Sequence, residues 1–121
     1  MKLKTFCLMM FFIIPSFVMA SESVSTMATV LTELNHFPSA KHKKSLAAII
    51  ANKASSENEK LLAKMISEIE HKASTADKEK LKTILSDAAE TKAVKIIAKA
   101  ILNTMHKPTA NDIEALKTLI D

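Results

Sequence analysis

Apolar residues recur at intervals of three and four positions along most of this chain, which is the pattern of helices with one buried face. The stretch from residue 74 to 87 is a clear case, with Leu81, Ile84 and Leu85 on one side of the predicted helix. Ser74 precedes this stripe as an N-cap, and Asp77 follows at the capping-box position. The same pattern predicts six helices. The first begins at Ser21 or Ser23, and the others begin at Ser39, Ser56, Ser74, Thr91 and Thr109.

These helices repeat along the chain with a period of about 35 residues, a length typical of two-helix repeats. One such hairpin cannot bury its apolar stripe alone, but three packed together can. We therefore expect an all-α fold of three stacked αα-hairpins, over about 22–52, 56–87 and 91–121, forming a short solenoid or a compact bundle. The positions that coincide include Leu46, Leu81 and Leu116, the three caps before them, and His36, His71 and His106.

Residues 1–20 have a different pattern, that of a secretory signal peptide. Lys2 and Lys4 form a positive start, and an apolar run follows from residue 6 to 18. Val18-Met19-Ala20 offers a cleavage site that would leave Ser21 as the first residue. Because a bilayer span needs about 20 apolar residues, this run predicts no retained anchor. We expect a cleaved signal peptide, a single domain over 21–121, and export to the periplasm or the medium.

Composition then excludes several function classes. Without Lys2 and Lys4 the chain keeps 15 basic and 13 acidic side chains, so the net charge of +4 falls to +2. Every basic residue is lysine, and nucleic-acid readers rely on arginine forks and a large basic excess, so we expect no specific nucleic-acid binding. The chain has no glycine, which removes phosphate-binding loops and the nucleophile elbow of hydrolases. We expect neither an enzyme nor a cofactor.

The histidines at 36, 71 and 106 raise the question of a metal site, since imidazole is a common ligand. Equivalent positions in stacked repeats lie about 10 Å apart, one helix-packing distance. Ligands of one ion sit about 2 Å from it. The stacked arrangement therefore predicts no metal site, and each histidine is expected to cap the helix end it follows. His42 is expected on the surface.

Lysines form the most regular exposed pattern. Lys60 and Lys64 are one turn apart on the third helix, and Lys95 and Lys99 repeat them on the fifth, where Lys92 joins the same side. In a stack of repeats these rows would merge into one basic patch. The partner expected for such a patch is an anionic phospholipid headgroup, with each lysine contributing about 1 kcal/mol. The alternative is a solvated face with helical ion pairs such as Lys64 to Glu68.

Together these features predict a small exported, non-enzymatic binding protein, a secreted factor of the host-directed, virulence type that contacts anionic lipid through its lysine rows. One alternative is a periplasmic or secreted protein-interaction factor, either chaperone-like or an immunity-type inhibitor. A second is a hydrolase whose site is not recognisable. Apolar residues continue almost to the end of the chain, at Leu116, Leu119 and Ile120. An uncovered end of a solenoid can close by dimerisation, so a homodimer is a further expectation.

Overall fold

The computed structural model describes residues 21–120, and the regular elements in that range are six helices with no strand, so the predicted all-α class is confirmed. The predicted signal peptide, residues 1–20, lies outside the described residues, as does Asp121. None of the described helices is both long and apolar enough to span a bilayer. The helices are α2 (Glu22–Thr32), α3 (Ala40–Ala51), α4 (Glu57–Glu68), α5 (Thr75–Ser86), α6 (Lys92–Asn103) and α7 (Ala110–Lys117).

Each helix begins at a hydroxyl N-cap, as the sequence predicts. The cap oxygen accepts a hydrogen bond from the backbone N–H three residues on, which satisfies one of the free donors of the first turn. In α4 the cap is a complete capping box, because the Glu59 carboxylate also accepts from the backbone of Ser56. The caps are Ser21, Ser39, Ser56, Ser74, Thr91 and Thr109.

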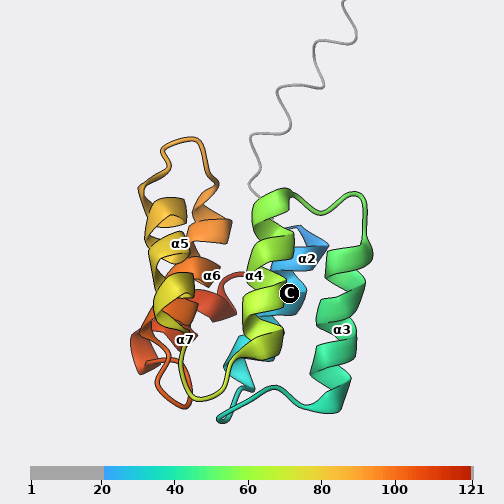
Figure 1. The fold of residues 1–121 in the computed structure, drawn as a ribbon, viewed down its shortest axis with the longest axis vertical. Helices are drawn as coiled ribbons and strands as arrows, with labels where there is room; N and C mark the ends of the chain where they lie inside the picture. The colour runs from blue at the N-terminus through green and yellow to red at the C-terminus, as the bar shows by residue number, and fades with distance from the viewer. Residues whose placement is uncertain (1–20, 121) are drawn as a thin grey trace, which may run out of the picture.

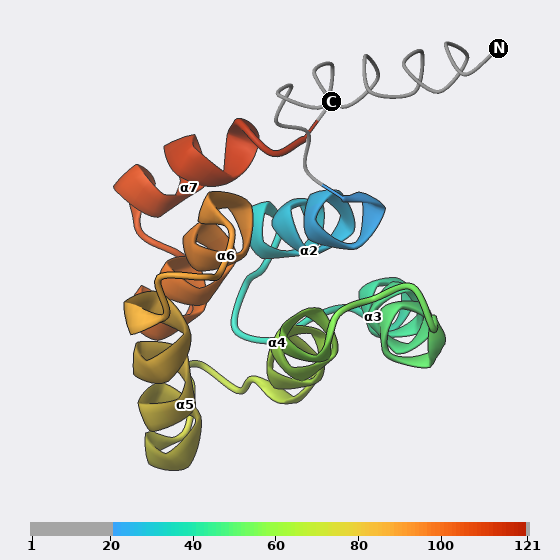
Figure 2. The same cartoon turned by 90° about the horizontal axis from the view of Figure 1, so that it is seen from above.

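The helices form two concentric layers around one axis. Helices α2, α4 and α6 pack against one another in the centre (Figure 2). Each outer helix packs against the inner helix of the next unit: α3 on α4, α5 on α6, and α7 back on α2 (Figures 1 and 2). Because the last helix meets the first inner helix, the three units close into a ring. The inner helices bury the side chains Met27, Leu31, Leu62, Ile66, Ile97 and Ile101 completely.

Of the two arrangements expected from the sequence, a short solenoid or a compact bundle, these contacts favour the compact bundle. Neighbouring units are related by rotation about a shared axis and not by translation along a solenoid. There is consequently no uncovered solenoid end: Leu116 is fully buried, and Leu119 and Ile120 are half-buried. The argument for a homodimer through an apolar end therefore fails, although the homodimer itself stays an untested prediction.

The three units differ at one interior position. Val24 in α2 and Val94 in α6 are buried near the start of their helices, and the equivalent residue of α4 is Glu59. The Glu59 side chain is also buried, with 9% of its surface exposed. Its second carboxylate oxygen accepts a hydrogen bond from the Ser21 hydroxyl at 2.9 Å. This contact joins the N-terminal ends of α2 and α4.

Ring closure predicts how replacing buried side chains of the outer helices with alanine changes stability. Leu46, Leu81 and Leu116 are all fully buried at equivalent positions, so Leu116→Ala should cost about 2–5 kcal/mol of unfolding free energy, as much as Leu46→Ala. Ile50→Ala, at a side chain with 38% of its surface exposed, is the control and should cost clearly less. Chemical denaturation measures all three, and a cost below about 1 kcal/mol for Leu116→Ala would contradict closure.

Candidate metal centre

The loops that follow the three inner helices converge at one end of the molecule, the lower end in Figure 1. Each loop places one histidine at its turn: His36 after α2, His71 after α4 and His106 after α6. All three have a left-handed backbone, with φ of 74°, 72° and 70°. This region is disfavoured for residues with a Cβ by about 1–2 kcal/mol, although histidine enters it more often than most residues. Three such residues at one place indicate that the surroundings impose the conformation.

Main-chain hydrogen bonds between the histidines form a closed cycle. His36 donates its N–H to the carbonyl of His106 at 2.6 Å, His106 donates to His71 at 2.6 Å, and His71 donates to His36 at 2.8 Å. Each residue is therefore donor to one neighbour and acceptor from the other. Such a cycle can close only when the three loops are related by rotation, so it defines the axis of the ring at this end.

The imidazole side chains gather around the same axis. Their ring centroids are 5.2, 4.8 and 4.9 Å apart, and their nearest ligand nitrogens all lie within 4.8 Å of one another. Nδ1 of His71 lies 3.0 Å from Nδ1 of His106, while Nδ1 of His36 lies 2.9 Å from the side-chain oxygen of Asn35. His36 is half-buried, and the other two are exposed. We call His36, His71 and His106 the three-histidine cluster.

This geometry corrects the expected spacing of about 10 Å between equivalent histidines. That spacing assumed translation between units, whereas rotation about a nearby axis brings equivalent residues together. The expectation that each imidazole caps the helix end it follows is also not met, because Nδ1 of His36 lies against the Asn35 side chain, and Nδ1 of His71 lies against Nδ1 of His106. Nitrogens bound to one tetrahedral Zn²⁺ at 2.0–2.1 Å lie about 3.4 Å apart. The ligand nitrogens of the cluster, all within 4.8 Å of one another, are close to that separation.

The helix dipoles at this end favour a cation. The central helices α2, α4 and α6 run in parallel. Ser21 and Glu59 join the N-terminal ends of α2 and α4, Asn58 donates to Glu90 just before α6, and the histidines join the C-terminal loops. The negative ends of three helix dipoles therefore point toward the three-histidine cluster. Each contributes about 0.3–1 kcal/mol to the binding of a nearby positive charge.

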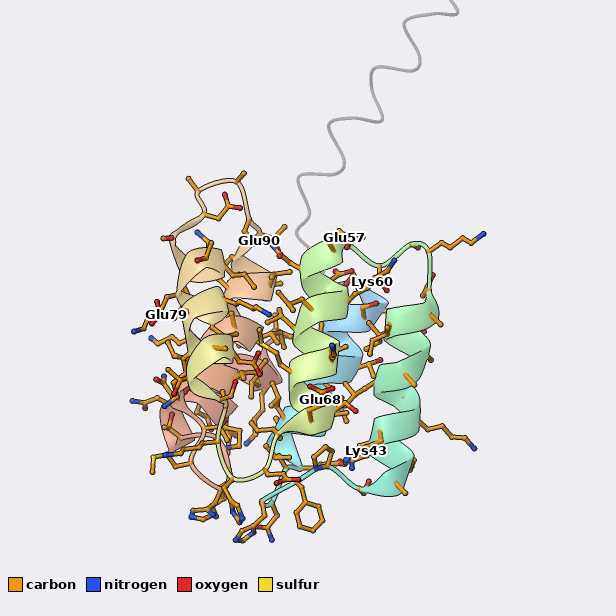
Figure 3. The ribbon with its side chains drawn as sticks, in the orientation of Figure 1. Lys43, Glu57, Lys60, Glu68, Glu79 and Glu90 are labelled. Carbon is orange, nitrogen blue, oxygen red and sulfur yellow. The ribbon has the colours of Figure 1, made fainter. Side chains whose placement is uncertain are left out.

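A hollow lies directly beside the cluster. It has a volume of about 690 Å³ and opens between α3 and the C-terminal end of α4. Phe37, Ile69 and His71 line it together with polar groups that include Lys43 and Glu68, which lie at the lower end of the molecule in Figure 3. An ion or a larger ligand can therefore reach His71 from solvent without any movement of the helices.

The lysines predicted to bind an anionic partner lie on α4 and α6, away from the cluster. Lys60 lies near the N-terminal end of α4, half-buried, with its ammonium 4.0 Å from the Glu57 carboxylate (Figure 3). Lys64, Lys92 and Lys99 are exposed, and Lys95 is half-buried. Because α4 and α6 are related by rotation, their lysine rows face different directions around the axis. The structure therefore gives no support to one merged patch, and binding through these residues stays a prediction.

Comparison with known proteins identifies no relative: no protein family, no curated protein and no solved structure matches this chain.

The positive φ at each histidine predicts an unusual response to substitution. His71→Gly should be more stable than His71→Ala by about 1 kcal/mol, because only alanine carries a Cβ that clashes in the left-handed region. At Ala47, an exposed helical residue of α3, the order should reverse, and Ala47→Gly should cost about 1 kcal/mol. Chemical unfolding in the presence of a chelator measures the stability of the variants at His71 and at Ala47. Equal stability of the two His71 variants would contradict the left-handed backbone of His71.

Proposed function

We propose that this protein binds a divalent transition-metal ion through His36, His71 and His106. The observation that carries the proposal is the convergence of three imidazoles around one axis, with their ligand nitrogens within 4.8 Å of one another. The convergence rests on main-chain hydrogen bonds, so the ligands are held in place before any ion arrives. Such preorganisation lowers the entropic cost of binding.

The donor set favours some ions over others. Imidazole nitrogen suits Zn²⁺, Cu²⁺ and Ni²⁺, whereas Mg²⁺ and Ca²⁺ prefer oxygen. Among the described residues, the group able to hold an ion contains only the three histidines, with no carboxylate in it. Three protein nitrogens leave at least one coordination position for an outside ligand. We therefore propose Zn²⁺ or a neighbouring ion of the same class.

We propose a binding role and not a catalytic one. A metal ion with an open position can activate water, which is the chemistry that a hydrolase of the unrecognised type would use. Catalysis of that kind also needs a site that excludes bulk water and positions a substrate. His71 and His106 are exposed, and the adjacent hollow is open to solvent. These features support capture or transfer of a metal ion. Such a role fits a protein-interaction factor or a secreted factor that sequesters metal.

Export and internal repetition belong to the same proposal. The signal-peptide pattern of residues 1–20 supports action in the periplasm or outside the cell, and recovery of a chain that begins at Ser21 would test it. The three helix pairs begin at matching positions, which supports their origin as copies of one unit of about 35 residues. A metal site on the axis of three copies needs only one histidine from each, so one loop sequence supplies the whole ligand set.

Metal binding can be tested with one ligand variant and one control. Titration calorimetry of the purified protein with Zn²⁺ should give a saturable site, and Mg²⁺ should give none. His71→Asn removes one ligand while asparagine tolerates the left-handed backbone, and it should weaken binding at least about tenfold. Zinc at a concentration 100 times its Kd should add about 2.7 kcal/mol to the unfolding free energy of the wild type.

His42→Asn is the matched control for this experiment. His42 lies outside the cluster, where its Nε2 is 2.8 Å from the Glu33 carboxylate, so its loss should leave the affinity for Zn²⁺ unchanged. The proposal fails if the wild type binds no zinc, or if the His42 and His71 variants lose the same affinity.

Contact with anionic lipid through the lysine rows is a second candidate function. One observation favours it: among the described residues, Lys64, Lys92, Lys95 and Lys99 have no carboxylate within 4.0 Å, including the Glu68 considered for Lys64. These ammonium groups are available to phosphate. The weak net charge of the domain and the rotation between α4 and α6 argue against a strong interaction.

Co-sedimentation with vesicles of an anionic phospholipid tests the lipid candidate. The wild type should sediment with the vesicles, and replacing Lys60, Lys64, Lys95 and Lys99 with alanine should weaken binding by a factor that falls as salt rises. Replacement of the exposed residues Lys41, Lys44, Lys80 and Lys82 removes the same charge from other helices as a control. Equal loss in both variants would show that overall charge, and not these rows, attracts the membrane.

A further inference from the structure

The three-histidine cluster supplies only part of the coordination shell of a metal ion. Zn²⁺ takes at least four ligands and Ni²⁺ up to six, while one chain offers three imidazoles here. Because His71 and His106 are exposed, the remaining positions on a bound ion face away from the molecule. Any further ligand must therefore come from water or from a second molecule.

Two exposed apolar side chains lie in the loops that carry the cluster. Phe37 directly follows His36 and has 60% of its surface exposed, and Met105 directly precedes His106 with 66% exposed. Among the described residues only one other large hydrophobic side chain, Ile50 on α3, is exposed. Apolar groups gathered beside a site indicate contact with another protein surface. If water alone completed the coordination shell of the metal ion, Phe37 and Met105 would stay exposed to solvent.

This face offers both a hollow and an exposed apolar side chain. The hollow of about 690 Å³ lined by Phe37, Ile69 and His71 lies beside one loop, and Met105 in another loop is exposed. In a two-fold arrangement, each copy can place its Met105 in the hollow of the other, and both contacts form at once. Methionine suits this role because its flexible side chain adapts to an irregular surface.

The charges on the face are also compatible with pairing of two copies. Glu70 precedes His71 in its loop, and Lys72 and Lys107 follow their histidines. All three are exposed, so a second copy turned about a two-fold axis can set lysine of one chain against Glu70 of the other. Opposite charges on one face favour a self-complementary contact over repulsion.

We infer that a transition-metal ion joins two copies of this chain face to face, with the three-histidine clusters of both copies supplying ligands to the same ion. This inference rests on the proposed metal binding and adds the partner. The face consists of three short loops, whereas stable dimers bury about 800 Å² per partner. The ion is therefore the main link, and the dimer should form only when metal is bound.

The test measures mass and metal content of the purified protein together. Light scattering should give the monomer mass in EDTA and twice that mass after addition of Zn²⁺ or Ni²⁺ alone. Native mass spectrometry should find about one ion for each pair of chains. One ion per chain with a monomer mass would overturn the dimer while leaving metal binding intact, and absence of any bound ion would overturn both.

Two surface variants separate the interface from the ligands. Met105→Lys removes the projecting side chain, keeps all three histidines, and should lower the dimer fraction while zinc still binds to single chains. Ile50→Lys makes the same change on α3, outside the face, and should leave the metal-dependent dimer unchanged. A dimer that persists in EDTA or in His71→Asn would contradict a metal bridge. A Met105→Lys variant that dimerises like the wild type would contradict the place of Met105 in the interface between the two copies.

Discussion

The cycle of main-chain hydrogen bonds between His36, His71 and His106 is the constraint on which the site depends. Each bond contributes about 0.5–1.5 kcal/mol, and each histidine loses about 1–2 kcal/mol by adopting positive φ, so the cycle does little for stability by itself. Burial of the inner faces of α2, α4 and α6 supplies the stability instead. The effect of the cycle is on orientation: it holds the three loops so that their imidazoles lie around one axis.

Much of the local structure could be predicted from the sequence because it is encoded locally. Hydroxyl caps mark where all six helices begin, and Pro38 and Pro108 lie in the loops after α2 and α6. Apolar spacing identifies the buried faces, including Leu46, Leu81 and Leu116. None of these signals requires knowledge of how distant parts of the chain meet.

The arrangement of the units could not be predicted in the same way. A period of about 35 residues indicates that successive units make equivalent contacts. Units related by translation and units related by rotation would show the same period in the sequence. Only the closing contact of α7 on α2 distinguishes them, and it joins opposite ends of the chain. One signal was nevertheless present: in a chain without glycine, a histidine at the same turn of every unit must take the left-handed conformation that glycine usually takes. Read that way, the three histidines share more than a capping role.

Glu59 has a consequence for the order in which the ring assembles. Three units with similar apolar interiors could dock in the wrong order, or with units borrowed from another chain, at little cost in buried area. A buried carboxylate is not interchangeable with Val24 or Val94, because it needs its donors at the backbone of Ser56 and the hydroxyl of Ser21. In a misplaced unit that charge would lose the contact with Ser21 and remain partly unsatisfied. Glu59 thus marks the junction of the first and second units, and distinguishes the native order of the units from permuted orders.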